Sequence, residues 1–401
     1  MVRRLILNLL LLCLSLAGGA QSHYLPMPAP SDSVTISLLT CAPGSEVYEL
    51  EGHSALRMQY GSTDIVANWG IFDFSSPNFI YRFCKGETDY CIGVLPADRF
   101  FTQYAIYHRR VTGQVLNLTE AEARDVIAIV DRNLDPPDRM YRYNYVLDNC
   151  ATRPLAVIEK ALGQKITFHA EPFRAEPTFR SEMRWFHTHY PWYQFGIDLA
   201  LGTGIDSLIS LRATMFAPVE LERLISTATI RTPEGEIPLV RATHTIVPGP
   251  AEGAILPPTP WYLTPLSVCW MIFAITLVVS IAGCRRSRLF KGFDAILFGI
   301  CGIAGCVIAF LVFISVHEST SPNWVLAWLN PLALLVPLLI FSGAGRRCLR
   351  WYFYINILLC LSALAVAVGG IQVFNAAFYP LILADLLRSA CFILISRNVT
   401  K

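Results

Sequence analysis

One cysteine and one histidine have neighbours that suit nucleophilic catalysis. Cys150 lies in the run YNYVLDNCATR (143–153), at the expected first turn of a helix, and Arg153 adds a cation close by. Unpaired N–H groups and the positive end of a helix dipole stabilise a thiolate, the reactive form of cysteine. His53, in the run EGHSALRM (51–58), could take the thiol proton. We therefore consider Cys150 a candidate nucleophile and His53 its candidate base.

The cysteine pattern also allows a structural interpretation, in which Cys150 forms a disulfide. Residues 21–264 contain an even set of four cysteines, Cys41, Cys84, Cys91 and Cys150, which could form disulfides in an oxidising compartment. Cys84 and Cys91 are close enough in sequence to bridge a hairpin, which would leave Cys41 to pair with Cys150. Spacing alone does not separate a disulfide from a nucleophile.

Strands and helices around these residues must hold them in place. Residues 33–48 and 54–69 contain short β-branched and apolar runs broken by Gly, Pro and Ser, which indicate strands. The sequence TEAE (119–122) is a capping box that predicts a helix to about Asn133. A second helix is expected from near Cys150 to Gly163.

The remaining part of this region gives weaker signals. Residues 164–192 are polar and aromatic without periodicity, so we expect a loop, and helical patterns resume over 193–228. We predict that residues 23–245 form one α+β domain and that the proline-rich residues 246–264 form an extended linker.

The composition indicates a membrane protein. Of the 401 residues, 54% are hydrophobic and only 15% are charged, whereas a soluble domain carries about a quarter charged residues. The apolar excess is concentrated at the N-terminus and beyond residue 264. Five segments there are long enough to cross a bilayer as helices, at about 265–283, 293–315, 324–342, 351–370 and 374–396.

Two independent signals give the orientation. Arg3 and Arg4, an apolar stretch and the small residues 17–20 form a signal peptide over residues 1–20, so the following region is exported. Lysine and arginine gather after the first, third and fifth apolar segments and are missing from the other two connections. Basic loops stay in the cytoplasm, so we expect a bacterial inner-membrane protein with a cytoplasmic C-terminus and residues 21–264 in the periplasm.

The net charge of +2 and the lack of a long basic run argue against nucleic acid as a partner. We expect no metal and no cofactor. The sequence gives no indication of the oligomeric state.

A resemblance links these motifs. The Gly-His-Ser strand, NWGIFDF (68–74), the run 143–153 and the sequences PNW (322–324) and WLNP (328–331) are together similar to the Bacteroides-type lipoprotein N-acyltransferase (Lnb) family. The order of histidine before cysteine also resembles circularly permuted papain-like (NlpC-like) thiol acyltransferases. The resemblance implies a permuted papain-like exported domain followed by a five-helix transmembrane domain.

The resemblance also implies roles for further residues. In the permuted group a third polar residue on the strand after the histidine orients the imidazole. Asn68 fits that place best, with Asp73 and Asp64 as rivals. Residues that would support the site or bind substrate are Tyr143, Asn144, Asn149, Arg153 and Asp73.

The implied reaction is acyl transfer through a thioester. Cys150 would attack an ester of a membrane phospholipid, with His53 as base, and the acyl chain would pass to the N-terminal amine of a diacylglyceryl-cysteine on an exported lipoprotein. The backbone N–H of Cys150 should supply part of the oxyanion hole. Phospholipid and lipoproteins are therefore the expected partners.

Two alternatives remain open. The first is a membrane-tethered cysteine hydrolase, such as a cell-wall peptidase, a protease or a phospholipase, which would use the same Cys150 and His53. The second is a non-enzymatic exported scaffold in which all four cysteines form disulfides.

Several polar and aromatic residues lie near or within the membrane segments. Asp385 and Arg388 are three residues apart and should meet on one helix face, where they would neutralise each other or contact substrate. His317 and Glu318 lie in an exported loop and are expected to be solvated. The aromatic stretch 185–195 suits a membrane interface.

Overall fold

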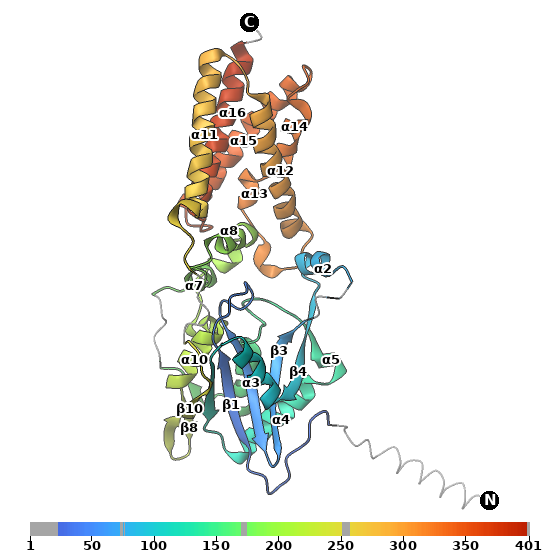
Figure 1. Cartoon of the computed structure of the whole chain (residues 1–401), viewed down its shortest axis with the longest axis vertical. Coiled ribbons are helices and arrows are strands. Elements are labelled where there is room, and N and C mark those ends of the chain that lie inside the picture. Colours follow the sequence, from blue (N-terminus) through green and yellow to red (C-terminus); the bar gives the residue numbers. More distant parts are fainter. Residues whose placement is uncertain (1–22, 73–74, 76, 170–174, 251–256, 399–401) are drawn as a thin grey trace, which may run out of the picture.

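The computed structural model is an elongated molecule with a sheet-containing domain at one end and a bundle of long helices at the other (Figure 1). It describes residues 23–72, 75, 77–169, 175–250 and 257–398. The predicted signal peptide (1–20) and Asp73 lie outside the described residues.

A seven-stranded antiparallel sheet forms the centre of the exported domain. Its strand order is β10-β5-β1-β2-β3-β4-β6. The strands are β1 (Thr35–Cys41), β2 (His53–Tyr60), β3 (Thr63–Ile71), β4 (Asp89–Pro96), β5 (Val111–Leu116), β6 (Met140–Arg142) and β10 (Val240–Val247). The predicted strands at 33–48 and 54–69 are confirmed as β1, β2 and β3. Strand β10 carries the sheet into the first residues of the segment predicted as linker.

Helices cover both faces of this sheet. Because side chains alternate along a strand, Leu56 and Met58 of β2 face α4 (Glu120–Asn133) and α6 (Thr152–Leu162) in the larger core. Ala55 of β2 instead packs in a second core with residues of α3 (Ala97–Ile106). The sequence predicted both α4, with its capping box at Thr119, and α6.

Shorter elements complete the domain. A three-stranded sheet contains β7 (Ile166–Thr167), β8 (Thr229–Thr232) and β9 (Gly235–Pro238). The short helices are α2 (Phe79–Lys85), α5 (Pro136–Arg139), α7 (Phe179–Phe186), α8 (Pro191–Ala200), η1 (Thr203–Ile205), α9 (Leu211–Thr214) and α10 (Pro218–Thr227). The prediction of a loop over 164–192 is therefore wrong for α7, which Thr178 caps by a local hydrogen bond that hydropathy does not reveal.

Four helices are long and apolar enough to cross a membrane. They are α11 (Pro265–Arg286), α12 (Lys291–Phe313), α15 (Gly345–Val368) and α16 (Phe378–Asn398). The third predicted span does not form one continuous helix. It is divided into α13 (Val325–Trp328), η4 (Pro331–Leu334) and α14 (Leu335–Leu339), with the short turns η2 (Trp261–Leu263) and η3 (Glu318–Thr320) in the flanking connections.

Proline explains the break in the third segment, and two glycines explain how it is tolerated. Pro331 follows Asn330 directly and cannot donate a backbone hydrogen bond, so a helix cannot continue through it. A Cβ on Gly302 of α12 would lie 2.7 Å from the backbone nitrogen of Leu334, and one on Gly305 would lie 2.5 Å from the carbonyl carbon of Asn330. The glycines let α12 cover the broken segment, which keeps its irregular backbone inside protein.

The buried charges of α16 do not pair with each other as expected. Arg388 donates to both oxygens of Asp294 on α12, at 2.7 and 2.9 Å. Asp385 accepts a hydrogen bond from Asn356 of α15 at 2.5 Å. The two side chains face different neighbouring helices, and Arg388 forms a two-point ion pair with Asp294.

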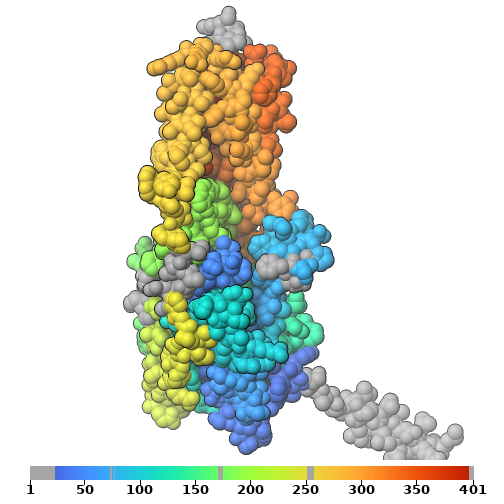
Figure 2. Space-filling view, in the orientation of Figure 1, coloured from blue at the N-terminus to red at the C-terminus, as the bar shows by residue number. Residues whose placement is uncertain are grey.

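The exported domain rests directly on the membrane helices. Figure 2 shows α8, in bright green, enclosed between the blue and cyan sheet domain and the yellow and orange helices. We call this contact region the junction; it comprises residues 191–203 of the exported domain and the loops 316–323 and 372–375 of the membrane domain. Asn323 Nδ2 donates to the carbonyl of Leu199 at 2.8 Å, and Asn375 Nδ2 donates to Asp198 at 2.8 Å.

The junction corrects the expectation for the exported loop. The ring of His317 hydrogen-bonds the carbonyl of Phe83 at 2.9 Å, so it is not free in solvent. Glu318 is exposed but accepts a hydrogen bond from Asn144 at 3.2 Å. Within the aromatic stretch, Trp192 donates to the carbonyl of Leu263 at 2.8 Å and packs against the start of the membrane domain.

Candidate active site

The candidate histidine and its partner lie on adjacent strands. His53 is the first residue of β2, and Asn68 lies on β3, where it is paired with Ala55. His53 Nε2 and Asn68 Oδ1 are 2.5 Å apart. Since Asn68 fixes one ring nitrogen, Nδ1 is the nitrogen left to exchange a proton with another group.

Gly52 holds the chain in the conformation that starts β2. Its φ of +84° is strained for other residues, and a Cβ there would lie 2.6 Å from the carbonyl oxygen of Cys41. Gly52 therefore allows β2 to begin at His53 while lying against β1.

Cys150 lies beside the same end of the β2–β3 hairpin. The backbone N–H groups of Ser54 and of Cys150 itself, together with the Tyr143 hydroxyl, are directed at its sulfur. A Cβ on Gly70 would lie 3.7 Å from the Cys150 Cβ and 3.6 Å from the Tyr143 ring. Gly70 forms a bulge in β3, with a φ of +89°, and this bulge admits the cysteine. The sulfur thus lies next to the residue that follows His53.

Asn149 anchors the cysteine to the start of α6. Its side-chain oxygen accepts from the backbone N–H groups of Ala151 and Thr152, at 2.8 and 3.0 Å, and the Thr152 hydroxyl accepts from the Asn149 N–H at 2.8 Å. Cys150 lies just before Thr152, the first residue of α6, and not within the helix as expected. The reciprocal cap extends ordered backbone across the cysteine.

Both reactive groups are neutral at rest. Burial raises the pKa of Cys150 to about 11, against the opposing effect of the hydrogen bonds from Ser54, its own N–H and Tyr143. Burial likewise lowers the pKa of His53 to about 4, although the bond to Asn68 acts the other way. The expected stabilised thiolate is therefore wrong for the resting state: desolvation outweighs the nearby N–H dipoles.

All eleven cysteines within the described residues are free, including the four of the exported domain. Cys150 is 9% exposed, and Cys41 is fully buried. The Tyr104 hydroxyl hydrogen-bonds the Cys41 thiol, and burial raises the Cys41 pKa to about 12. The Cys41–Cys150 disulfide considered above is absent from the described part of the chain.

The remaining expected site residues have distinct surroundings. Arg153 forms an ion pair with Asp148, with Nη2 and Oδ2 2.6 Å apart, and its guanidinium lies 3.9 Å from the Tyr141 ring centroid. The charge of Arg153 is thus paired with that of Asp148, so Arg153 is not an isolated cation beside the thiol. Asn144 accepts from the N–H groups of Val146 and Leu147 and so shapes the loop before Cys150.

Sequence reasoning missed three side chains next to this site. Tyr145 donates to Glu51 with an oxygen–oxygen distance of 2.5 Å, and His187 Nε2 lies 3.7 Å from the same carboxylate. Coulombic repulsion from Glu51 contributes to the raised pKa of Cys150, which places the carboxylate near the sulfur. The one available signal was that Glu51 stands two residues before His53.

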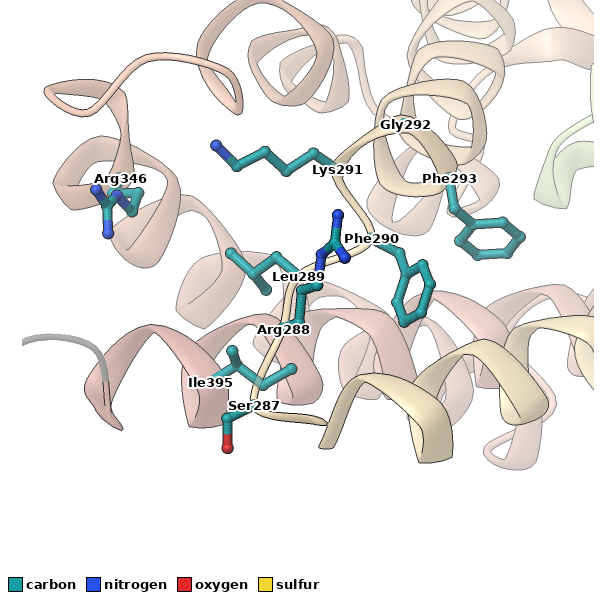
Figure 3. Close-up of a pocket in the computed structure, with 9 residues that line it drawn as sticks. All are labelled: Ser287, Arg288, Leu289, Phe290, Lys291, Gly292, Phe293, Arg346 and Ile395. Atoms are coloured by element: carbon teal, nitrogen blue, oxygen red, sulfur yellow. The ribbon is translucent and has the colours of Figure 1, made fainter. Parts of the chain in front are cut away.

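A cavity of about 750 Å³ lies away from this site. It is at the end of the membrane domain farthest from the sheet, where Arg288, Lys291 and Arg346 line it (Figure 3). Arg288 belongs to the connection between α11 and α12, and Arg346 lies at the start of α15. The cavity therefore brings two of the predicted basic loops to one end of the bundle, opposite the exported domain.

Fold and site together define a membrane protein with an extramembrane α+β domain, in which a buried, free cysteine lies against the backbone of the residue that follows His53. Two family models match the chain: the Lnb N-terminal periplasmic domain over residues 21–181 and the Lnb transmembrane domain over residues 258–399. The chain belongs to the Lnb family. It is accordingly an inner-membrane protein with a periplasmic N-terminal domain. No match was found among curated proteins or among solved structures. The permuted papain-like fold stays a prediction.

Proposed function

We propose that this protein is a cysteine-dependent lipoprotein N-acyltransferase. It moves an acyl chain from a membrane phospholipid to Cys150, and then to the N-terminal amine of a diacylglyceryl-cysteine lipoprotein. Membership of the Lnb family supports this class of reaction. The observation that carries the proposal is the free sulfur of Cys150 against the backbone N–H of Ser54, which directly follows the His53 that is hydrogen-bonded to Asn68.

In the first half-reaction, His53 removes the thiol proton as the sulfur attacks the ester carbonyl. A neutral thiol and a neutral imidazole suit this step, because the proton moves only when substrate is present. The imidazolium then protonates the departing oxygen of the lysophospholipid. Asn68 keeps the ring oriented throughout and stabilises its charged form.

The tetrahedral intermediate needs donors for its oxyanion. The backbone N–H groups of Ser54 and Cys150 and the Tyr143 hydroxyl are directed at the sulfur in the resting site. Small movements would bring two of them to an oxygen on the carbon bound to that sulfur. Each such donor typically contributes about 10²–10³ in rate. Tyr143 is the side-chain candidate that sequence alone did not single out for this role.

The second half-reaction transfers the acyl group to nitrogen. The incoming amine attacks the thioester, the carbon–sulfur bond breaks, and His53 passes a proton to the departing thiolate. Burial of Cys150 at the junction side of the domain would limit hydrolysis of the thioester by water.

The test uses purified protein in phospholipid vesicles with a diacylated lipopeptide, followed by mass spectrometry of the lipopeptide. We expect a mass increase of one acyl chain, absent in Cys150→Ala and in His53→Ala. Asn68→Ala should reduce the rate by about 10²-fold or more, since the ring would lose its orientation. Release of free fatty acid or of peptide fragments without acylated lipopeptide would favour the hydrolase alternative. Absence of acylated lipopeptide, free fatty acid and peptide fragments alike would favour the scaffold.

A further inference from the structure

A second polar cluster lies between the Cys150 loop and the helices at the junction. Buried Glu51, from the segment before β2, and buried His187, from the end of α7, meet half-buried Tyr145 of the Cys150 loop there, with no cation among the described residues of the cluster. Their hydrogen bonds do not satisfy one another, which makes the cluster unusual for a protein interior.

The hydrogen bonds identify which atoms lack a donor. Tyr145 supplies one proton to Glu51. His187 Nδ1 lies 2.7 Å from Gln194 Oε1, which can only accept, so Nδ1 carries the ring proton and Nε2 carries a lone pair. Burial lowers the pKa of His187 to about 4 and keeps the ring in this neutral form.

When the Glu51 carboxylate is ionised, two acceptors face each other. His187 Nε2 is fully buried and has no hydrogen-bond partner among the described residues, and it lies 3.7 Å from Glu51 Oε1. A buried acceptor left without a donor destabilises the protein. A group with several N–H donors and a positive charge would satisfy both atoms at once, and the Glu51 side chain, 10% exposed, can be reached from outside.

The location of the cluster indicates which positively charged group would bind there. Gln194, which orients His187, belongs to α8 in the junction, so the cluster lies between the nucleophile and the membrane domain. A membrane-anchored acceptor must approach Cys150 from this side. We infer that Glu51 and His187 Nε2 form the subsite that binds the primary ammonium of the acceptor and that the Glu51 carboxylate removes its first proton. This inference rests on the proposed function.

The proton balance requires such a base. A primary ammonium has three N–H bonds and no lone pair, so it cannot attack the thioester. Glu51 takes one proton and leaves a neutral amine. The amine nitrogen bonds to the carbonyl carbon, its second proton passes through His53 to the leaving thiolate of Cys150, and the amide keeps the third. Glu51 then releases its proton to water, so one proton is released for each amide formed.

The ionisation of Glu51 fits this role. Burial raises the pKa of Glu51 to about 7, and the Tyr145 hydrogen bond opposes the rise only in part. An α-amino group has a pKa of about 8, so proton transfer between the two is nearly balanced. The other titratable groups that face the carboxylate are Tyr143, Tyr193, Cys150 and His187, and burial keeps all four neutral near pH 7.

The experiment separates the two half-reactions in full-length protein in phospholipid vesicles. Acyl-enzyme formation is followed by the mass of the intact protein, and single-turnover transfer to a diacylated lipopeptide is followed from pH 6 to pH 9. Glu51→Gln keeps an acceptor for Tyr145 and should form the acyl-enzyme no more slowly than wild type, because it also removes the charge that contributes to the raised pKa of Cys150. Its transfer rate at pH 7 should fall by about tenfold, since only about a tenth of an amine with a pKa of about 8 is unprotonated there, and should recover as the pH rises to 9 and the amine deprotonates unaided.

Hydroxylamine provides the discriminating reagent, because it is largely unprotonated at neutral pH and needs no base to remove an ammonium proton. It should cleave the acyl-enzyme of Glu51→Gln and of wild type equally fast. Glu46→Gln removes the same charge from an exposed position in the same segment and serves as the matched control.

Three outcomes would overturn the inference. Equal transfer rates of Glu51→Gln and wild type at pH 7 would show that Glu51 does not act as the base. An equal loss of lipopeptide and hydroxylamine reactions would indicate a structural role only. Absence of an acyl-enzyme in the wild type would overturn the proposed function and the subsite with it. If Glu51→Gln does not fold, wild type alone decides: lipopeptide transfer that rises about fivefold between pH 7 and pH 8, as the unprotonated fraction of an amine with a pKa of about 8 does, would mean that no base assists it.

Discussion

At the residue scale, the site combines a weak acid and a weak base that are both kept uncharged by burial. The pKa of His53 is about 4 and that of Cys150 is about 11, so neither group changes its protonation state in the neutral pH range. Acyl-enzyme formation should therefore be nearly independent of pH across the neutral range. The pH dependence of the complete reaction should come from the transfer half-reaction and from Glu51.

The conformation of Gly52 makes a prediction about positioning. Gly52→Ala places a Cβ against the Cys41 carbonyl oxygen and strains a positive φ, at a cost of about 1–3 kcal/mol. We expect His53 to shift and acyl-enzyme formation to slow by at least about tenfold. Gly163→Ala is the control, because Gly163 also has a positive φ but has open space around it. Equal activity of the two variants would refute a positioning role for Gly52.

Glu51 should destabilise the folded protein at high pH. Its pKa rises from 4.5 to about 7 on folding, so the folded chain favours the protonated form. This stabilising contribution is complete below pH 4.5 and is lost as the pH rises through 7. Glu51→Gln should therefore melt at the wild-type temperature near pH 4.5 and at a higher temperature at pH 8. Thermal melts at both values test this, and a difference that does not change with pH would contradict it.

The sequence predicted Cys150, His53 and Asn68 because each belongs to a local run with a recognisable pattern. It could not predict the cluster of Glu51, Tyr145 and His187. These side chains come from distant segments that touch only in the fold, and each looks ordinary in its own run. The sequence also could not predict that the thiol is neutral, because desolvation depends on which residues cover the sulfur in the fold.

At the element scale, four of the five predicted spans form continuous helices, and the third does not. Hydropathy reports only the length of an apolar segment and not the continuity of its backbone. Asn330 and Pro331 were visible in the sequence as part of a family motif, yet the irregular path also depends on α12, whose glycines make room for it. The same limit applies to Arg388, whose partner Asp294 lies on a different helix.

The contact between α12 and the broken segment can be tested with alanine. Gly305→Ala would place a Cβ 2.5 Å from the Asn330 carbonyl carbon, which forces the backbones apart at a cost of about 1–3 kcal/mol. Gly292→Ala near the start of the same helix meets nothing within 4 Å. Both variants gain helix propensity, so the difference in their melting temperatures in detergent isolates the clash. We expect Gly305→Ala to melt lower, and equal melting temperatures would contradict close packing.

At the scale of the whole molecule, the two domains form one body through the junction and not only through the proline-rich connection. Composition and charge predicted an exported domain and a membrane domain, but a linker in sequence does not reveal whether the domains touch. The junction depends on pairings such as Asn323 with Leu199 and Asn375 with Asp198, which join distant parts of the chain.

Loosening the junction should separate catalysis from access to the membrane. We expect Asn323→Ala combined with Asn375→Ala to lower acyl transfer from vesicle phospholipid by about tenfold, because each lost hydrogen bond contributes about 1 kcal/mol. Acylation of Cys150 by a soluble short-chain ester should stay unchanged. A parallel loss of both reactions would mean that the variant disturbs the catalytic residues themselves.

The contact between the exported domain and the membrane domain also determines which substrate concentration sets the reaction rate. In the proposed reaction, Cys150 is held in a fixed position over one leaflet, so phospholipid and lipoprotein would both reach it by lateral diffusion within that leaflet, without entering the aqueous phase. The relevant variable is then the number of substrate molecules per unit area. Diluting proteoliposomes with buffer should leave the turnover of each enzyme unaffected, whereas diluting the same substrates with inert lipid within the bilayer should slow it.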